Sequence, residues 1–382
     1  MSEKQKVQLE PSSKICNAAT KAFLMIVSRI LLISSLLLLF DGNIGAADTE
    51  AGYLAPEWKR QEFDLGDVSW VISWCGEHKL VVAIDGKVVM VNLIDNSVQP
   101  IDSGFIYIPS LSCSGDGEFA SFLDRNRHDL IVAETSSLKV MRVYQGYPKA
   151  TGVPVFNFIS PHGNFLVGLE EFPDHILLGD RELPVVKIQA GIGRIDWDHD
   201  ESRLYWKNNN WYEFAMMDIK TKKPRLFAPG VKGFIIYDIK SSFRNSKEVY
   251  LHLEAKEENF GNIYRFSLGT NQAQVLVADV ENTRISISDD DVLVFSRSDY
   301  PKNKPGFEKN PHLAIPLAAE IYLFKDGKEY LVASIKSEFG TVQPFISKSG
   351  NQIAYSEIKY GADYLPLKKT RRLVILRRVD QK

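Results

Sequence analysis

The chain has 382 residues, of which 45% are hydrophobic and 25% are charged, and its formal net charge is −2. This length can hold one large all-β domain or two ordinary domains, and the apolar fraction is sufficient for a full core. The near-neutral charge excludes a general nucleic-acid binder, because neutralising phosphates requires clustered positive charge.

The first feature along the chain is an apolar run. Residues 22–40 read AFLMIVSRILLISSLLLLF and are interrupted only by Arg29 and three serines. Four lysines precede this run, namely Lys4, Lys6, Lys14 and Lys21. Positive charges before an apolar segment predict export with the N-terminus on the cytoplasmic side.

Two forms of this export segment remain open. Small residues at Gly45 and Ala47 would allow cleavage before Asp48, which favours a signal peptide over residues 1–47. The alternative is an uncleaved anchor, because residues 23–40 are just long enough to span a bilayer. In both cases we expect a periplasmic or otherwise extracytoplasmic protein, secreted or anchored, whose N-terminal segment contacts the membrane at least before cleavage.

After a mainly polar stretch at 48–61, which we expect to be a linker with a short strand starting around Lys59, the chain becomes repetitive. The best-formed unit is Val155 to Ile188, where Phe156 and Phe158 lead into a Ser-Pro-His-Gly turn. Three more β-type runs follow it, at Phe165 to Leu169, Ile176 to Leu178 and Val185 to Ile188. Short runs cut by Gly, Pro and Asp predict an antiparallel four-stranded meander.

A comparable turn occurs seven times, at intervals of roughly 37 to 60 residues. The turns are Trp74 to Gly76, Cys113 to Gly117, Ser160 to Gly163, Trp197 to Asp200, Phe243 to Ser246, Ser288 to Asp291 and Ser347 to Gly350. This period is typical of propeller blades. We therefore predict an all-β fold, a single β-propeller of six or seven four-stranded blades with seven preferred, over residues 62–379 and followed by a tail at 380–382.

The last unit lacks a fourth strand, because its third strand, Arg371 to Val379, ends the repeat region. A propeller must close its ring or leave sheet edges exposed. The strand around Glu62 and Phe63 is therefore expected to supply the missing outer strand, so that the N-terminal strand closes the ring.

Three segments resemble a known repeat. They are the turn Ser160 to Gly163, the run Ile353 to Ser356 after the last turn, and Ile321 to Phe324 before Asp326 and Gly327. Together they resemble the TolB-like, WD40-like propeller repeat, whose usual form has a Ser-Pro-Asp-Gly turn, an Ile-Ala-Phe strand and an Ile-Tyr strand. The resemblance covers about residues 62–379 and departs at blades one, four and five. It implies a periplasmic protein-interaction role by analogy of fold.

No catalytic, metal or cofactor signature emerges. Asp196 to Ser202 resembles the start of a calcium loop, but the glycine that such a loop requires is Glu201 and its twelfth position is Lys207. Asp289 to Asp291 occupies the corresponding place in blade six, and we interpret both stretches as strand turns. The seven histidines lack metal-type spacing, and no Gly-x-Ser-x-Gly elbow occurs.

Cys75 and Cys113 fall at equivalent points of blades one and two, at the end of the innermost strand. They would be exported together into a compartment that permits disulfides. A disulfide between them is possible if their Cα atoms come within about 7 Å, and two buried free thiols are the alternative.

The strongest functional indication is the position of the insertions. In each of blades five, six and seven, a longer segment links the second and third strands: Glu254 to Gly261, Asp299 to Ala319 and Lys359 to Arg372, respectively. All three segments therefore extend over one face. Insertions on one face of a repeat protein often mark its binding face. The candidate binding residues are aromatic or basic, with one histidine: Tyr300, Lys302, Lys304, Phe307, Lys309, His312, Tyr360, Tyr364, Lys368, Lys369, Arg371 and Arg372.

We therefore predict a non-catalytic module of the cell envelope that binds or scaffolds another protein or an envelope glycan, without cofactor or nucleic acid. Aromatic and arginine side chains dominate interface energetics, and the lysines could steer an acidic partner. The alternative is an enzyme acting on glycan or peptide at the loop-rich face, with a site assembled from propeller loops. Clustered carboxylates around the central channel would favour it. The propeller of a prolyl-oligopeptidase-like protein would need a downstream hydrolase domain, which we do not expect here.

Overall fold

The structure is a computed structural model, and it divides the chain into two units, residues 1–50 and residues 51–382. It describes residues 53–63, 65, 68–84, 87–101, 111–124, 129–144, 157–169, 175–180, 186–189, 195–208, 210–255, 260–281, 285–299, 318–336, 343–357, 359 and 372–379. The expected export segment lies outside these ranges. Within them, no helix is long and apolar enough to cross a membrane.

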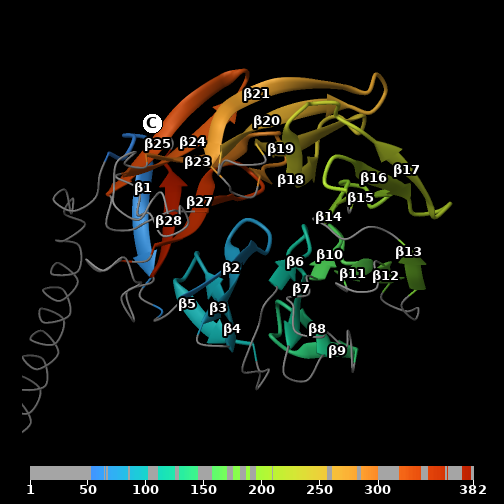
Figure 1. Cartoon of the computed structure of the whole chain (residues 1–382). Helices are drawn as coiled ribbons and strands as arrows, with labels where there is room; N and C mark the ends of the chain where they lie inside the picture. The colour runs from blue at the N-terminus through green and yellow to red at the C-terminus, as the bar shows by residue number, and fades with distance from the viewer. Residues whose placement is uncertain are drawn as a thin grey trace, which may run out of the picture. The chain divides into compact units, whose positions relative to one another are not determined.

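The described chain forms 28 strands in seven four-stranded antiparallel sheets, which are the blades of a β-propeller (Figure 1). Blade one contains β2 (Val68–Trp74), β3 (Lys79–Ile84), β4 (Lys87–Asn92) and β5 (Ser97–Pro100). Blade two contains β6 (Leu111–Cys113), β7 (Phe119–Asp124), β8 (Asp129–Glu134) and β9 (Val140–Tyr144). Blade three contains β10 (Asn157–Ile159), β11 (Phe165–Leu169), β12 (His175–Asp180) and β13 (Val186–Gln189).

The remaining blades repeat this order. Blade four contains β14 (Ile195–Trp197), β15 (Arg203–Lys207), β16 (Phe214–Asp218) and β17 (Lys223–Phe227). Blade five contains β18 (Phe234–Ser241), β19 (Glu248–Ala255), β20 (Phe260–Ser267) and β21 (Gln272–Glu281). Blade six contains β22 (Ser286–Ile287), β23 (Leu293–Asp299), β24 (Ala318–Lys325) and β25 (Lys328–Lys336). Blade seven contains β26 (Phe345–Ile346), β27 (Gln352–Glu357), β28 (Arg372–Arg378) and β1 (Trp58–Phe63).

The ring is closed by β1, which pairs with β28 from Trp58 opposite Arg378 to Phe63 opposite Leu373. This confirms the predicted closure by an N-terminal strand, and the seven sheets match the preferred blade number. The expected linker at 48–61 is shorter than we proposed. Leu54 already bridges to Ala333 of β25, and Trp58 is 4% exposed. An exposed edge strand favours such pairing, because its backbone groups lack partners.

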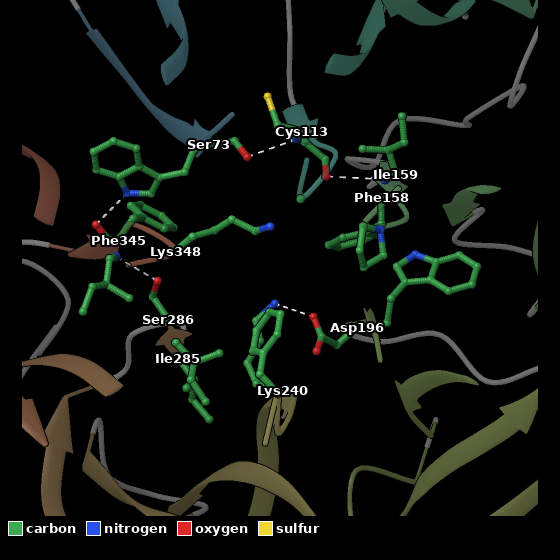
Figure 2. A pocket seen from close by; sticks show the side chains of 18 of the residues that line it. Ser73, Cys113, Phe158, Ile159, Asp196, Lys240, Ile285, Ser286, Phe345 and Lys348 are labelled. Carbon is green, nitrogen blue, oxygen red and sulfur yellow. Dashed lines mark hydrogen bonds and ion pairs between the residues drawn. The ribbon is translucent and has the colours of Figure 1, made fainter. Parts of the chain in front are cut away.

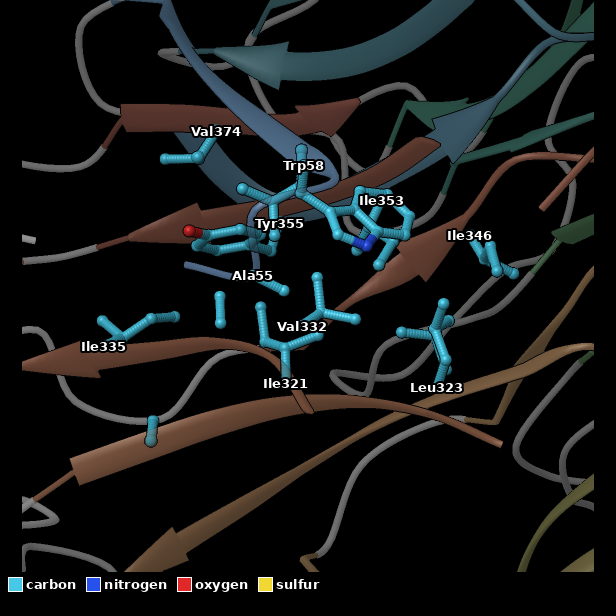
Figure 3. Close-up of a cluster of buried hydrophobic side chains, with 14 of the residues drawn as sticks. Ala55, Trp58, Ile321, Leu323, Val332, Ile335, Ile346, Ile353, Tyr355 and Val374 are labelled. Carbon is cyan, nitrogen blue, oxygen red and sulfur yellow. The ribbon is translucent and has the colours of Figure 1, made fainter. Parts of the chain in front are cut away.

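The core is divided among the interfaces between blades. Buried apolar side chains of the described residues form seven clusters, and each joins one blade to the next around the ring. Between blades six and seven, Trp58 and Tyr355 pack against Ile321 and Val332 (Figure 3). Both faces of a blade are covered in this way, which explains why second strands such as β27 are buried throughout.

Candidate functional site

The first strand of every blade lines a central cavity of about 280 Å³ (Figure 2). Turn residues between first and second strands, such as Pro161, His199 and Lys348, also line it, so the cavity opens at the end of the ring that carries these turns. We call this the turn end. The insertions predicted to bind a partner link second and third strands, and an antiparallel meander places these links at the opposite, loop end.

Polar side chains of the first strands join neighbouring blades around the cavity. The edge of a first strand has no further strand to pair with, so its amides need other acceptors. Each acceptor in this series belongs to the blade before. The bonds are Cys113 N–H to Ser73 Oγ at 3.1 Å, Ile159 N–H to Ser112 Oγ at 3.4 Å, Ser241 N–H to Asp196 Oδ2 at 2.7 Å, Ile285 N–H to Asp238 Oδ2 at 2.8 Å and Ile346 N–H to Ser286 Oγ at 3.0 Å. Sequence reasoning missed this role, although a short polar residue within five of the first strands, β2, β6, β14, β18 and β22, was a visible signal.

Two carboxylates on the first strands therefore have a structural role. Asp196 accepts a bond from Ser241 Oγ at 2.9 Å and forms an ion pair with Lys240 at 2.7 Å, in addition to its backbone bond. Asp238 is 3% exposed and holds the amide of Ile285. Because these bonds occupy them, neither carboxylate is placed to exchange a proton with a substrate, as a general acid or base must.

The acidic turn of blade four also serves the fold. Glu201 has a φ of 58° at the position where the turn of blade three has Gly163, a conformation that costs a non-glycine residue about 1 kcal/mol or more. Its carboxylate holds the preceding turn, accepting bonds from His162 N–H at 2.6 Å and Asn164 Nδ2 at 2.8 Å. Asp291 does the same for blade five, through Phe243 N–H at 2.8 Å.

Asp198 has the most perturbed carboxyl group of this turn. It is 3% exposed and accepts bonds from Arg203 N–H and Ser202 Oγ, both at 2.8 Å. Burial raises the pKa of Asp198 to about 6 despite these bonds. In the part of the chain that the structure describes, no group of three or more His, Cys, Asp or Glu side chains could hold a metal ion.

The rim of the turn end combines aromatic and charged side chains. His162, His199 and Phe243 form a row across blades three to five, with ring centroids 5.8 Å and 5.5 Å apart. Lys240 of blade five and Lys348 of blade seven extend into the cavity (Figure 2). The cavity thus has positively charged ammonium groups beside an apolar and aromatic wall.

Of the twelve predicted binding residues, only Arg372 lies in the described part of the chain. Its guanidinium contacts Glu62 of β1 and Glu357 of β27, the latter at 3.0 Å, so it belongs to the ring closure. The other eleven lie outside the described residues: Tyr300, Lys302, Lys304, Phe307, Lys309, His312, Tyr360, Tyr364, Lys368, Lys369 and Arg371. The structure does place the insertions around residues 300–317 and 358–371 between second and third strands, as predicted.

Cys75 and Cys113 lie side by side at the junction of blades one and two and are joined in the structure, with Cα atoms 5.2 Å apart. This separation falls within the range that a disulfide requires. The backbones of the two blades also approach closely here. A Cβ added to Gly117 would meet the carbonyl carbon of Cys75 at 2.7 Å.

Comparison with known proteins supports the fold alone. No protein-family model matches the chain, and no curated protein sequence matches it. It is similar to a chain of the mitotic checkpoint complex, with 14% identity over 87% of this chain and 94% of that chain, at a TM-score of 0.61. It is also similar to the β-propeller domain of Cps50 (Swd1) from Myceliophteria thermophila, with 13% identity over 85% of this chain and 99% of that chain, at a TM-score of 0.57. A third similar structure is virginiamycin B lyase from Staphylococcus aureus, with 12% identity over 84% of this chain and 99% of that chain, at a TM-score of 0.57. The chain thus has a β-propeller fold.

Proposed function

We propose that this chain is an exported, non-catalytic β-propeller that binds a partner protein or an envelope ligand through the loop end of blades five to seven. The observation that carries the proposal is the commitment of Asp196 and Asp238 to bonds that hold the blades together. A propeller enzyme would need carboxylates or other acid–base groups free in the channel. Their structural use favours a scaffold that presents loops.

Two further points support binding. The inserted segments of blades five to seven all link second and third strands, so the aromatic and basic side chains that they carry would gather over one end of the ring. Proteins of the same fold include a chain of the mitotic checkpoint complex, which works within an assembly. The resemblance of the repeats to TolB-like proteins points to the periplasm as the compartment.

The test compares two triple variants. Lys302→Ser, Lys304→Ser and Lys309→Ser together remove three charges from the largest insertion. The control removes three charges from exposed positions elsewhere on the ring, at Lys223, Lys232 and Lys328. We expect affinity capture from membranes to lose the bound partner only with the first variant, while the far-ultraviolet spectrum stays unchanged in both. Equal retention of the partner would refute the loop end as the binding face.

Export is tested on the same material by N-terminal sequencing. A protein that begins at Asp48 in the envelope fraction would indicate a cleaved signal peptide, and an uncleaved N-terminus in the membrane fraction would indicate an anchor. Recovery of the protein in the cytoplasm alone would contradict export.

A second candidate is an enzyme acting on peptide or glycan at the turn end. Two exposed imidazoles, His162 and His199, lie at the cavity mouth, and Asp198 directly precedes His199 in the chain. Virginiamycin B lyase has a similar fold. The purified protein would then consume a peptide mixture or soluble cell-wall glycan, and the double variant His162→Ala, His199→Ala would not. Absence of turnover by the unmodified protein on both would exclude this candidate.

A further inference from the structure

We propose that the turn end of the channel is a second binding site, which takes a carboxylate group attached to an apolar or aromatic group, and that Lys348 is its anchor. This site lies at the end of the ring opposite the loop end. It stands whether or not the loops of blades five to seven bind a partner.

The first argument is the state of the two lysines that reach into the cavity (Figure 2). Lys240 is 2.7 Å from Asp196, within the distance of a direct charged hydrogen bond. Lys348 is different, because its Nζ makes one ion-pair contact among the described residues, to Asp289 Oδ2 at 3.7 Å. An ammonium has three donors, so Lys348 keeps hydrogen-bonding capacity for a ligand.

The contact with Asp289 is too weak to prevent this. Its length exceeds that of a charged N–H···O bond by almost 1 Å. Both side chains are also partly open to solvent, at 36% for Lys348 and 42% for Asp289. Ion pairs in such positions contribute between nothing and about 1 kcal/mol. A ligand carboxylate that meets Lys348 directly can therefore displace Asp289.

The second argument is the wall around the ammonium. Phe158, Phe345 and Ile285 line the cavity from three blades, and Figure 2 shows them around the same central space as Lys348. The row of His162, His199 and Phe243 continues this surface to the rim. Ligand sites are typically concave and mainly apolar, with a few polar groups that fix orientation. A cavity of about 280 Å³ suits a small acid or the last one or two residues of a peptide.

A carboxylate beside an apolar group occurs both in small aromatic acids and at the C-terminus of a peptide that ends in an apolar residue. The probes separate these sources. One pair is phenylacetate and its uncharged amide. The other is the tripeptide Ala-Ala-Phe with a free C-terminus and the same peptide with an amidated C-terminus. Binding of each probe to the purified protein is measured by isothermal titration calorimetry.

We expect at least one acid to bind, and its amide to bind about 10- to 100-fold more weakly, because a hydrogen bond to a charged group is lost. Lys348→Met should weaken the acid to the same extent, whereas Lys348→Arg should retain most of the affinity. Asp289→Asn should tighten binding, since it removes the competing carboxylate. The matched control is Lys328→Met, at an exposed position of the outer strand β25.

Preference for phenylacetate would identify a small-acid site, and preference for the peptide acid would identify a C-terminus site; both support the proposal. Three results would overturn it: no binding of either acid, equal binding of acid and amide, or an affinity that Lys348→Met leaves unchanged. Because no partner protein is present in the titration, none of these results bears on the proposed function of the loop end.

Discussion

Replacing Glu357 with Gln should destabilise the ring closure more than any comparable change at its surface. Glu357 is 1% exposed and ends β27, the strand that pairs with β28, and β28 in turn pairs with β1 to close the ring. Both of its oxygens accept bonds from Arg60 of β1, at 2.8 Å and 2.7 Å, and Oε2 also accepts one from Arg372 at 3.0 Å. Burial opposes the charge on Arg60, but Tyr355, Glu357 and Glu62 outweigh it and raise the pKa of Arg60 further.

The magnitude follows from burial. Removing one partner of a buried ion pair costs about 3–5 kcal/mol, because the remaining charge stays buried without compensation. Gln keeps one acceptor oxygen, so we expect Glu357→Gln to lower the free energy of unfolding by about 3 kcal/mol. The matched control is Glu62→Gln, in the same network but 38% exposed, which should cost less than about 1 kcal/mol.

The assay is urea unfolding followed by tryptophan fluorescence, to which the buried Trp58 of β1 contributes. Midpoints are compared between variants whose denaturant slopes agree. The double variant Arg60→Met, Glu357→Leu should regain most of the lost stability, since apolar side chains often replace a buried ion pair without cost. If Glu357→Gln costs no more than Glu62→Gln, burial of this network does not stabilise the closure as argued.

Two further predictions concern the cysteine pair and the acidic turn of blade four. When the exported protein is alkylated without reduction, its mass should show no free thiol at Cys75 or Cys113. Two free thiols would exclude the disulfide. Cys75→Ser should lower the free energy of unfolding by about 4 kcal/mol, because the disulfide closes a separation of 38 residues. The folded pKa of Asp198 lies above its unfolded value, so its contribution to stability is present at pH 4 and is lost as the pH rises through about 6. The stability of the unmodified protein relative to Asp198→Asn should therefore fall by roughly 2 kcal/mol between pH 4 and pH 7. Parallel pH profiles from urea unfolding would contradict this.

The strands and their order could be read from local patterns. In blade three, the strands predicted at Phe165 to Leu169 and around Ile176 correspond to β11 and β12, because alternation and turn residues act over a few positions. Ring closure was also predictable, since the last unit lacked one strand and an unpaired strand preceded the first.

The contacts of the acidic turns were harder to predict from the sequence. The departure from a Ser-Pro-Asp-Gly turn at Glu201 was visible, and its interpretation as a turn rather than a calcium loop agrees with the bonds it makes. The hydrogen bonds of Glu201 to the turn of the preceding blade could not be predicted, because the pattern of one turn does not show which neighbour it faces. Arg372 illustrates the same limit, because its contacts with Glu62 and Glu357, which lie far from it in the sequence or on another strand, were not predicted.

The sequence by itself determined an all-β chain of six or seven repeated units with its closing strand, because each depends on spacing within a repeat. Only the tertiary structure decided which side chains meet at the axis and at the closure. Arg60 and Glu357 are 297 positions apart, and Lys240 and Lys348 come from different blades. In a propeller every blade brings its first strand to one axis, so residues with no relation in the sequence become neighbours there, and the channel site exists only once the ring has closed.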